Sequence, residues 1–357
     1  MLRGLIDRFV GRRDWAITVP PMDGALRPNQ MLEEAHVAAE ARAPDNLILH
    51  HGEVVFSSGR ELRKLETGAV VRSFDRPIAC LAAADGRLAV GLTGAEVTVF
   101  EPGGAVTPLP VAQSSCATAL AFLDDSLIVC RGSTQHAPDQ WKHDLMESGI
   151  AQQGSGSVVL FPRDGAPRLI ADQLRWPFGV LPVGDRIVVS ESWAHRLISL
   201  DPHGAVRPKP LLSDLPGYPA RLAPASDGAA WLSVFAPRSQ LIEFVLREDG
   251  YRRRMVSEID PDYWIAPALA NGRSFLEPIQ GGALKQMGVL KPWAPSRSYG
   301  LVIKLNGDFE PTLSLHSRAD GSRHGTTSVV ESSGTVFVAS KGGDVILAMP
   351  IDELVEQ

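Results

Sequence analysis

One pattern recurs six times along this chain, and it limits the fold more than any other feature. Each copy contains an apolar run, a turn with Asp or Gly, a β-branched run that ends in a small residue, and a further strand. The copies begin near residues 44, 76, 116, 176, 219 and 325, and the fifth, PARLAPASDGAAWLSVFAPRSQLIEFV, is predicted to end in a strand at LIEFV (241–245). Short strands that are separated by such turns at this spacing indicate an all-β repeat array.

The array is predicted to close into a six-bladed β-propeller. Strand-like pieces between the copies, such as AVTPLPV, bring each copy to about four strands, which is the content of one blade. We expect residues 1–18 to be an N-terminal extension and residues 19–357 to be a single propeller domain. The strand AITVPP (16–21) is expected to close the ring against the last blade, because closure removes exposed sheet edges. The first strand of each blade would then line a central channel.

Two insertions, at about 133–150 and 249–297, interrupt the repeats. The first has a helical pattern, with Pro138 suited to a first turn and with Trp141 and Leu145 on one face. Both are predicted to cover the channel mouth as helical or loop lids, because long insertions in compact folds commonly serve function. Packing of Trp141 against a blade is the alternative.

Charge and cysteine content limit the partners and the cellular location that we expect for this chain. The formal net charge is −6 and no Lys/Arg-rich run occurs, which argues against nucleic-acid binding and favours a small-molecule partner. The first 15 residues are too short and too charged for a signal peptide or a membrane span. Three cysteines without a CxxC pair make a disulfide framework unexpected and favour a reducing, cytoplasmic location.

Familiar cofactor motifs are missing from the sequence. It contains no Gly-rich phosphate loop after a strand, no HExxH, no GxSxG and no Cys/His zinc cluster. We therefore predict no cofactor.

Several segments in order resemble one family. They are PDNL at 44–47, the insertion STQHAPDQWKHDLMESG, ESWAHRL at 191–197, LPGYP at 215–219, YGLVIKL at 299–305, and TSVVE with GTVFVAS within 327–340. Together they resemble strictosidine synthase-like proteins, within the six-bladed propeller group that includes paraoxonase and the SMP-30/gluconolactonase lactonases. The resemblance spans nearly the whole chain from about Val19 and implies the propeller fold, but fold alone does not fix function.

The resemblance implies a catalytic calcium that this sequence does not support. In the metal-dependent relatives an acid in the first blade and Asn or Asp residues in later inner strands hold the ion. The first-blade acid falls on Asp45, but the later positions read Thr118, Phe178 and the pair Ala220 and Arg221. At ~5 Å and an effective dielectric of ~20, a cation such as Arg221 would repel a divalent ion by roughly 6–7 kcal/mol. We predict no metal, although Asn46 matches the place of a second, structural ion in paraoxonase-like proteins.

The catalytic Glu of the strictosidine synthases is also replaced. Its position in HGTTSVVE falls on Thr327, with Glu331 four residues further along. Threonine cannot serve as a general acid or base near neutral pH, so the alkaloid-forming reaction is not supported.

The remaining channel residues form the candidate site. Asp45 and Arg221 are predicted either to make a structural ion pair, or to act as a base and as a clamp for a carboxylate or an oxyanion. His324 precedes the last inner strand and is the third candidate catalytic residue. The candidate substrate contacts are Thr118, Phe178, Ala220, Thr326, Thr327, His136 and Trp141.

Two functions follow from this site. The first is a metal-independent small-molecule enzyme of the strictosidine synthase-like and lactonase-like group, a hydrolase or a carbon–nitrogen lyase or condensing enzyme, acting in the central channel. The alternative is a catalytically degenerate propeller that binds a small metabolite or a protein partner without turnover.

Overall fold

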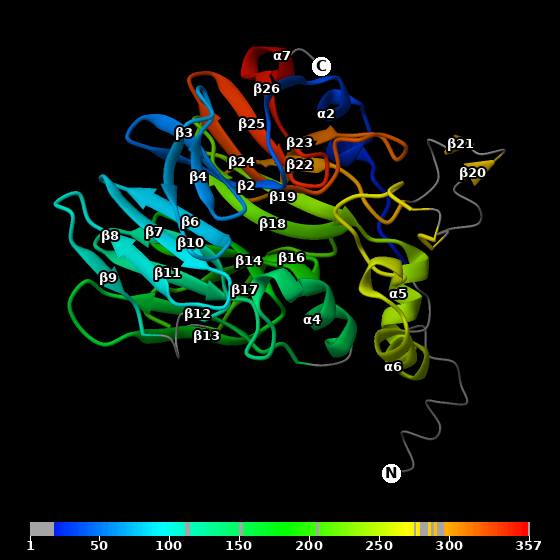
Figure 1. Cartoon of the computed structure of the whole chain (residues 1–357), viewed down its shortest axis with the longest axis horizontal. Helices are drawn as coiled ribbons and strands as arrows, with labels where there is room; N and C mark the ends of the chain where they lie inside the picture. Colours follow the sequence, from blue (N-terminus) through cyan, green and yellow to red (C-terminus); the bar gives the residue numbers. More distant parts are fainter. Residues whose placement is uncertain are drawn as a thin grey trace, which may run out of the picture.

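Six four-stranded antiparallel sheets form a closed ring, which confirms the predicted six-bladed β-propeller (Figure 1). The computed structural model describes residues 18–110, 115–149, 153–204, 207–274, 276–278, 285–286, 289–290 and 296–355 of the chain. The innermost strands are β2, β6, β10, β14, β18 and β24, and each packs on the next around the ring. Apolar clusters fill the spaces between neighbouring blades, as ring closure requires.

The first three blades follow the chain without a break in strand order. Blade 1 is β2 (Pro44–His50), β3 (Glu53–Ser58), β4 (Glu61–Lys64) and β5 (Val70–Ser73). Blade 2 is β6 (Ile78–Ala84), β7 (Arg87–Leu92), β8 (Val97–Phe100) and β9 (Val106–Pro108). Blade 3 is β10 (Ala117–Leu123), β11 (Ser126–Arg131), β12 (Gly156–Phe161) and β13 (Arg168–Leu174).

The last three blades include the long insertion and the ring closure. Blade 4 is β14 (Pro177–Val183), β15 (Arg186–Glu191), β16 (Arg196–Leu200) and β17 (Lys209–Leu212). Blade 5 is β18 (Gly217–Pro224), β19 (Ala230–Pro237), β22 (Leu301–Leu305) and β23 (Pro311–His316). Blade 6 is β24 (Thr326–Ser332), β25 (Thr335–Ser340), β26 (Val345–Pro350) and β1 (His36–Glu40).

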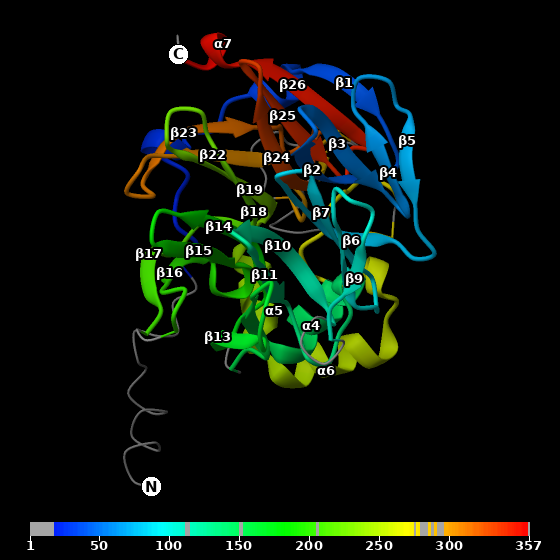
Figure 2. The ribbon, with the colours of Figure 1, turned by 90° about the vertical axis from the view of Figure 1, so that its left-hand side faces the viewer.

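The segment that closes the ring differs from the prediction. β1 pairs with β26 at the outer edge of blade 6, as Figure 2 shows, and not the segment AITVPP. Residues 18–21 of that segment lie in no strand, and residues 16 and 17 fall outside the described residues. Before β1 the chain forms η2 (Gly24–Leu26) and α2 (Met31–Glu34), which pack on β23.

Both insertions leave the ring at equivalent points, between the second and third strands of a blade. The first contains η3 (Pro138–Gln140) and α4 (Trp141–Ser148), and Pro138 takes the predicted place in a first turn. The second contains α5 (Gln240–Arg247), α6 (Asp249–Glu258), η5 (Pro261–Tyr263) and the short strands β20 (Lys285–Gln286) and β21 (Val289–Leu290). The short helix η4 (Ser192–Ala194) lies within blade 4, and α7 (Ile351–Val355) follows β26.

The segment that begins at Gln240 was expected to continue blade 5 as a strand, and it is the helix α5 instead. Its apolar residues Ile242, Val245 and Leu246 repeat with helical spacing, and all three are buried. The hydroxyl of Ser239 accepts a hydrogen bond from the Ile242 N–H and caps the helix. The third strand of blade 5 is therefore β22.

This topology directs both insertions to one face of the ring. In an antiparallel blade the second strand ends where the first begins, so the connection to the third strand leaves at the start of the innermost strand. The helices α4, α5 and α6 consequently lie together on one side of the ring (Figures 1 and 2). Among the described residues, no helix has the length and apolar content needed to cross a membrane.

Candidate functional site

Each innermost strand has a register irregularity near its start. The pairing with the second strand shifts in all six blades, next to Asp45, Ala79, Thr118, Phe178, Arg221 and Thr327. A bulge redirects side chains locally. Asp45, Thr118, Phe178, Arg221 and Thr327 therefore lie at a level of the ring where the innermost strands depart from the regular alternation of side chains.

Asp45 bridges two cations at this level. Its Oδ1 accepts hydrogen bonds from Arg221 Nη1 at 2.8 Å and from Thr327 Oγ1 at 2.9 Å, and also from the backbone N–H of Asn46. Its Oδ2 accepts one from Lys341 Nζ at 2.9 Å. Burial alone would raise the pKa of Asp45, but the attraction of Arg221 and Lys341 outweighs it and holds that pKa below its usual range. Asp45 is therefore ionised at neutral pH.

Arg221 spans the channel between several blades. Its Nη2 donates to the carbonyls of Ala79 at 2.7 Å and Thr118 at 3.3 Å, and its guanidinium lies 4.9 Å from the centre of the Phe178 ring. The predicted ion pair between Asp45 and Arg221 is present, and it is buried. Three blades besides its own thus hold Arg221 by polar contacts, and Phe178 of blade 4 packs on its face.

A cavity of about 340 Å³ lies over this ion cluster. Its wall includes Asp45, Arg221, Phe178 and Thr327 from the inner strands, as well as Trp141 of α4. Phe235 joins the wall, and its ring makes edge contacts with those of Trp141 at 5.3 Å and Phe178 at 5.7 Å. The first insertion therefore does cover the channel mouth, and Trp141 packs against a blade as well.

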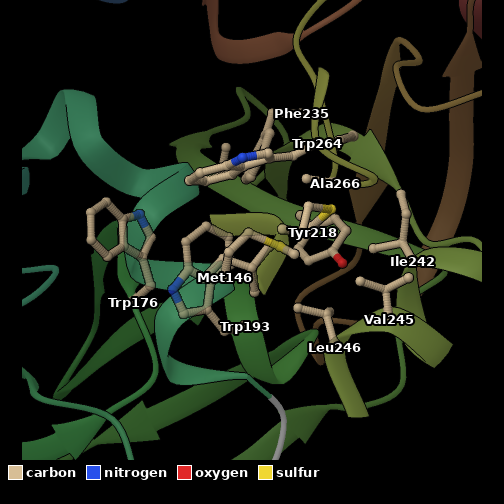
Figure 3. Close-up of a cluster of buried hydrophobic side chains, with 14 of the residues drawn as sticks. Met146, Trp176, Trp193, Tyr218, Phe235, Ile242, Val245, Leu246, Trp264 and Ala266 are labelled. Carbon is tan, nitrogen blue, oxygen red and sulfur yellow. The ribbon is translucent and has the colours of Figure 1, made fainter. Parts of the chain in front are cut away.

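A buried aromatic cluster holds this cover in place (Figure 3). Met146 of α4 lies among Trp176 and Trp193 of blade 4, and Trp176 and Trp193 stack with their ring centres 5.3 Å apart. Tyr218 and Phe235 of blade 5 join them, together with side chains of α5. Because the cover packs on two blades, Trp141 has a fixed place above the ion cluster.

Other predicted substrate contacts serve the framework around the cavity. The Thr118 hydroxyl donates to the carbonyls of Pro177 and Cys130, and that of Thr326 to those of Val234 and Leu301. Ala220 is fully buried in the aromatic cluster. None of these three lines the central cavity.

The two candidate histidines also lie away from the cavity. His324 donates from Nε2 to the Arg318 carbonyl and accepts at Nδ1 from the Ser298 hydroxyl, both at 2.7 Å, and burial lowers its pKa. His136 faces two carboxylates of α4, with Nδ1 3.1 Å from Asp144 Oδ2 and Nε2 3.2 Å from Glu147 Oε2. Asp144 is largely buried and accepts a hydrogen bond from Trp193 Nε1.

Lys341 is the site residue that sequence reasoning missed. It follows β25 directly, in the connection between the second and third strands of blade 6. That connection is equivalent to the two insertions, so the rule that sends them to the channel mouth could also have identified this lysine. Its side chain is 33% exposed, which leaves its ammonium accessible to a ligand.

The channel residues do not fit a calcium centre of the lactonase type. Calcium needs six to eight oxygen ligands, several of them carboxylates or amides. Asp45 is already bonded to two cations, Phe178 offers no oxygen, and the Arg221 guanidinium occupies the space beside the carboxylate. In the described ranges, no group of three or more His, Cys, Asp or Glu side chains is placed to hold a metal ion. Asn46 donates to Ser57 Oγ, and its Oδ1 has no partner in the part of the chain that the structure describes.

Solved structures with the same shape include a gluconolactonase from Xanthomonas campestris, at 12% identity, with 88% of each chain covered and a TM-score of 0.54. Regucalcin from Agrobacterium tumefaciens, described as a calcium-binding protein, matches at 9% identity, over 88% of this chain and 92% of that one, with a TM-score of 0.51. The likeness is one of fold. No protein-family model and no curated protein matches the chain.

Proposed function

We propose that the chain is a metal-independent small-molecule enzyme, a hydrolase or a carbon–nitrogen lyase, that takes a carboxylate or carbonyl ligand in the central cavity. The observation that carries the proposal is the charge of the cavity floor. Arg221 and Lys341 contribute two positive charges and Asp45 one negative charge, so the floor keeps one net positive charge below aromatic walls, whereas Asp139 in the same wall is exposed to solvent. A developing oxyanion is stabilised by fixed positive charge at such a site.

In the hydrolase form, the chain's own residues supply the chemistry. A water oxygen adds to the acyl carbon of an ester or lactone, and one proton of the water passes to Asp45 Oδ2. This oxygen is the freer of the two, because it accepts one hydrogen bond whereas Oδ1 accepts three. The carbonyl oxygen becomes an oxyanion beside the Lys341 ammonium. Collapse of this intermediate breaks the acyl–oxygen bond, and the leaving alkoxide takes the proton from Asp45. The likeness in fold to a gluconolactonase supports this form as analogy.

Binding without turnover is the second candidate, and the same carboxylate favours it. The pKa of Asp45 is held low by Arg221 and Lys341, which makes Asp45 a weak base. A site of this kind binds an anion well whether or not it also activates water.

The test is a Lys341→Met variant of chelator-treated protein, assayed with lactones, aryl esters and simple carboxylates. We expect turnover that calcium does not increase, and a fall in kcat/KM of about 10²-fold in the variant, as for loss of one oxyanion donor. Lys64→Met is the matched control, because Lys64 has a similar exposure of 38% and pairs with Glu53 in blade 1. Turnover that requires calcium would refute metal independence. Carboxylate binding that depends on Lys341, without any turnover, would establish the second candidate.

A further inference from the structure

A second chamber of about 570 Å³ adjoins the central cavity. The two share Lys341, Trp141, Leu269, Asp139 and Ala43 in their walls. The second chamber continues outward between the first insertion, the second insertion and the turn after β25. A ligand that reaches Lys341 can therefore extend into it.

Arg297 is a buried cation with unused hydrogen-bonding capacity in the wall of this chamber. It is 6% exposed, its Nη1 donates to the Asp262 carbonyl at 2.9 Å, and its Nε has no partner among the described residues. Its closest acid is Glu277, with Nη2 3.6 Å from Oε1. Because this Nε is enclosed by protein, an acidic ligand in the chamber would interact with Arg297 through its charge and its remaining Nη donors.

Lys142 of α4 adds a second positive charge to the same wall. Its Nζ donates to the Pro261 carbonyl at 3.0 Å, which leaves two of its three donors without a hydrogen bond to the described residues. Burial lowers the pKa of Lys142, and the nearby charge of Arg297 lowers it further. Two cations are therefore held close together where water is partly excluded.

The acids of the chamber offset these cations only in part. Glu277 is largely buried beside Arg297 and offsets one of the two positive charges. It also accepts hydrogen bonds from the backbone N–H groups of Gly272, Arg273 and Ser274. The other acids that line the chamber are exposed, and solvent screens their charges. These are Asp139, Asp262 and Asp344. Lys142, Arg297 and Glu277 together leave one net positive charge on the inner wall, and the rim is negative.

We propose that the second chamber binds a second acidic group of the same ligand, so that the ligand is an elongated small molecule with two acidic groups. One group lies against Lys341 and Arg221 in the central cavity, and the other lies against Arg297 and Lys142. This inference rests on the proposed function, because it extends the ligand of that site.

The test compares straight-chain monoacids and diacids of equal length on the full chain, by calorimetry and thermal shift. The pairs are pentanoate with glutarate, hexanoate with adipate, and heptanoate with pimelate. We expect the best diacid to bind about tenfold tighter than its monoacid, which is the value of one charge-assisted hydrogen bond. Arg297→Met and, independently, Lys142→Met should remove this difference and leave monoacid binding unchanged. Arg297→Lys should restore part of it, and Arg254→Met, at an exposed arginine of α6, is the control.

The outcomes separate this inference from the proposed function. If diacids and monoacids bind equally and neither variant changes that, the second chamber takes no acidic group. Monoacid binding that is lost in Lys341→Met would still support the central site in that case. If no acid binds the wild-type chain, the anion site of the proposed function fails, and this inference fails with it.

Discussion

Asp45 holds two cations together at the channel axis, and its four protein donors come from three different blades. Arg221 belongs to blade 5, whereas Thr327 and Lys341 belong to blade 6 and Asn46 to blade 1. Removing one member of a buried ionic cluster leaves the charges of the others uncompensated. The resulting loss of stability exceeds the net stabilisation that the intact cluster provides. The site therefore couples the chemistry of the cavity to the stability of the ring.

Replacing Asp45 by Asn should lower the free energy of unfolding by about 3–5 kcal/mol at pH 7, because Arg221 then has no buried counter-charge. Urea unfolding followed by circular dichroism measures this loss. Asp164→Asn, at an exposed acid, is the control and should change little. A variant that unfolds at the wild-type urea concentration would show that the carboxylate is not needed to compensate Arg221.

The same carboxylate predicts a pH dependence. Because the pKa of Asp45 is lower in the folded state, its stabilisation is fully present above the unfolded value of about 4 and is lost as the pH falls through the lower folded value. The wild-type chain should consequently lose more stability below pH 4 than Asp45→Asn does. Parallel acid profiles of the two proteins would contradict the assignment.

At the scale of elements, the first insertion is held over the cavity by the packing of its own apolar side chains. Met146 of α4 is 1% exposed between blade 4 and the second insertion. Met146→Ala should lower the free energy of unfolding by about 2–5 kcal/mol, through lost transfer energy and the cavity left behind. Denaturant unfolding measures it, with the exposed Glu258→Ala of α6 as control. If both variants unfold alike, the packing in Figure 3 does not anchor α4.

The elements that the sequence predicted well are those with a local signal. The innermost strands begin within two residues of the expected positions, because β-branched runs and Asp/Gly turns mark them directly. The residues after Ser239 were mistaken for a strand because LIEFV is rich in strand-forming types, while the cap and the helical spacing point the other way. The closing strand HVAAE was missed because alanine and glutamate carry little strand preference.

The candidate site likewise contains residues that the sequence pattern predicts and residues that it does not. Repeat position brought Asp45, Phe178, Arg221 and Thr327 to one cavity wall. Repeat position does not predict the surroundings of His324. Its hydrogen-bond partner Ser298 lies in the second insertion, and this insertion has no counterpart in the other repeats. Lys341 lies in a turn, where strand patterns give no information.

At the scale of the whole molecule, the ring depends on a segment from its N-terminal part. Leu32 of α2 is fully buried in the core of blades 5 and 6. The carboxylate of Glu33 accepts hydrogen bonds from the N–H groups of Ser322 and Arg323 and from the Ser317 hydroxyl. These contacts carry the chain across blade 5 to the place where β1 completes blade 6.

A chain that starts at residue 42 should therefore lose cooperative unfolding, whereas one that starts at residue 18 should keep it. Without β1 the edge of β26 is exposed and the core around Leu32 opens, so the shorter chain should also aggregate. Thermal unfolding by circular dichroism, with light scattering, distinguishes the two chains. A synthetic peptide of residues 18–42 should restore the transition in trans, because strand addition to a free edge is favourable. Equal midpoints for both chains would mean that the ring closes through contacts other than β1, and a peptide without effect would mean that α2 and β1 act only when covalently joined to blade 1.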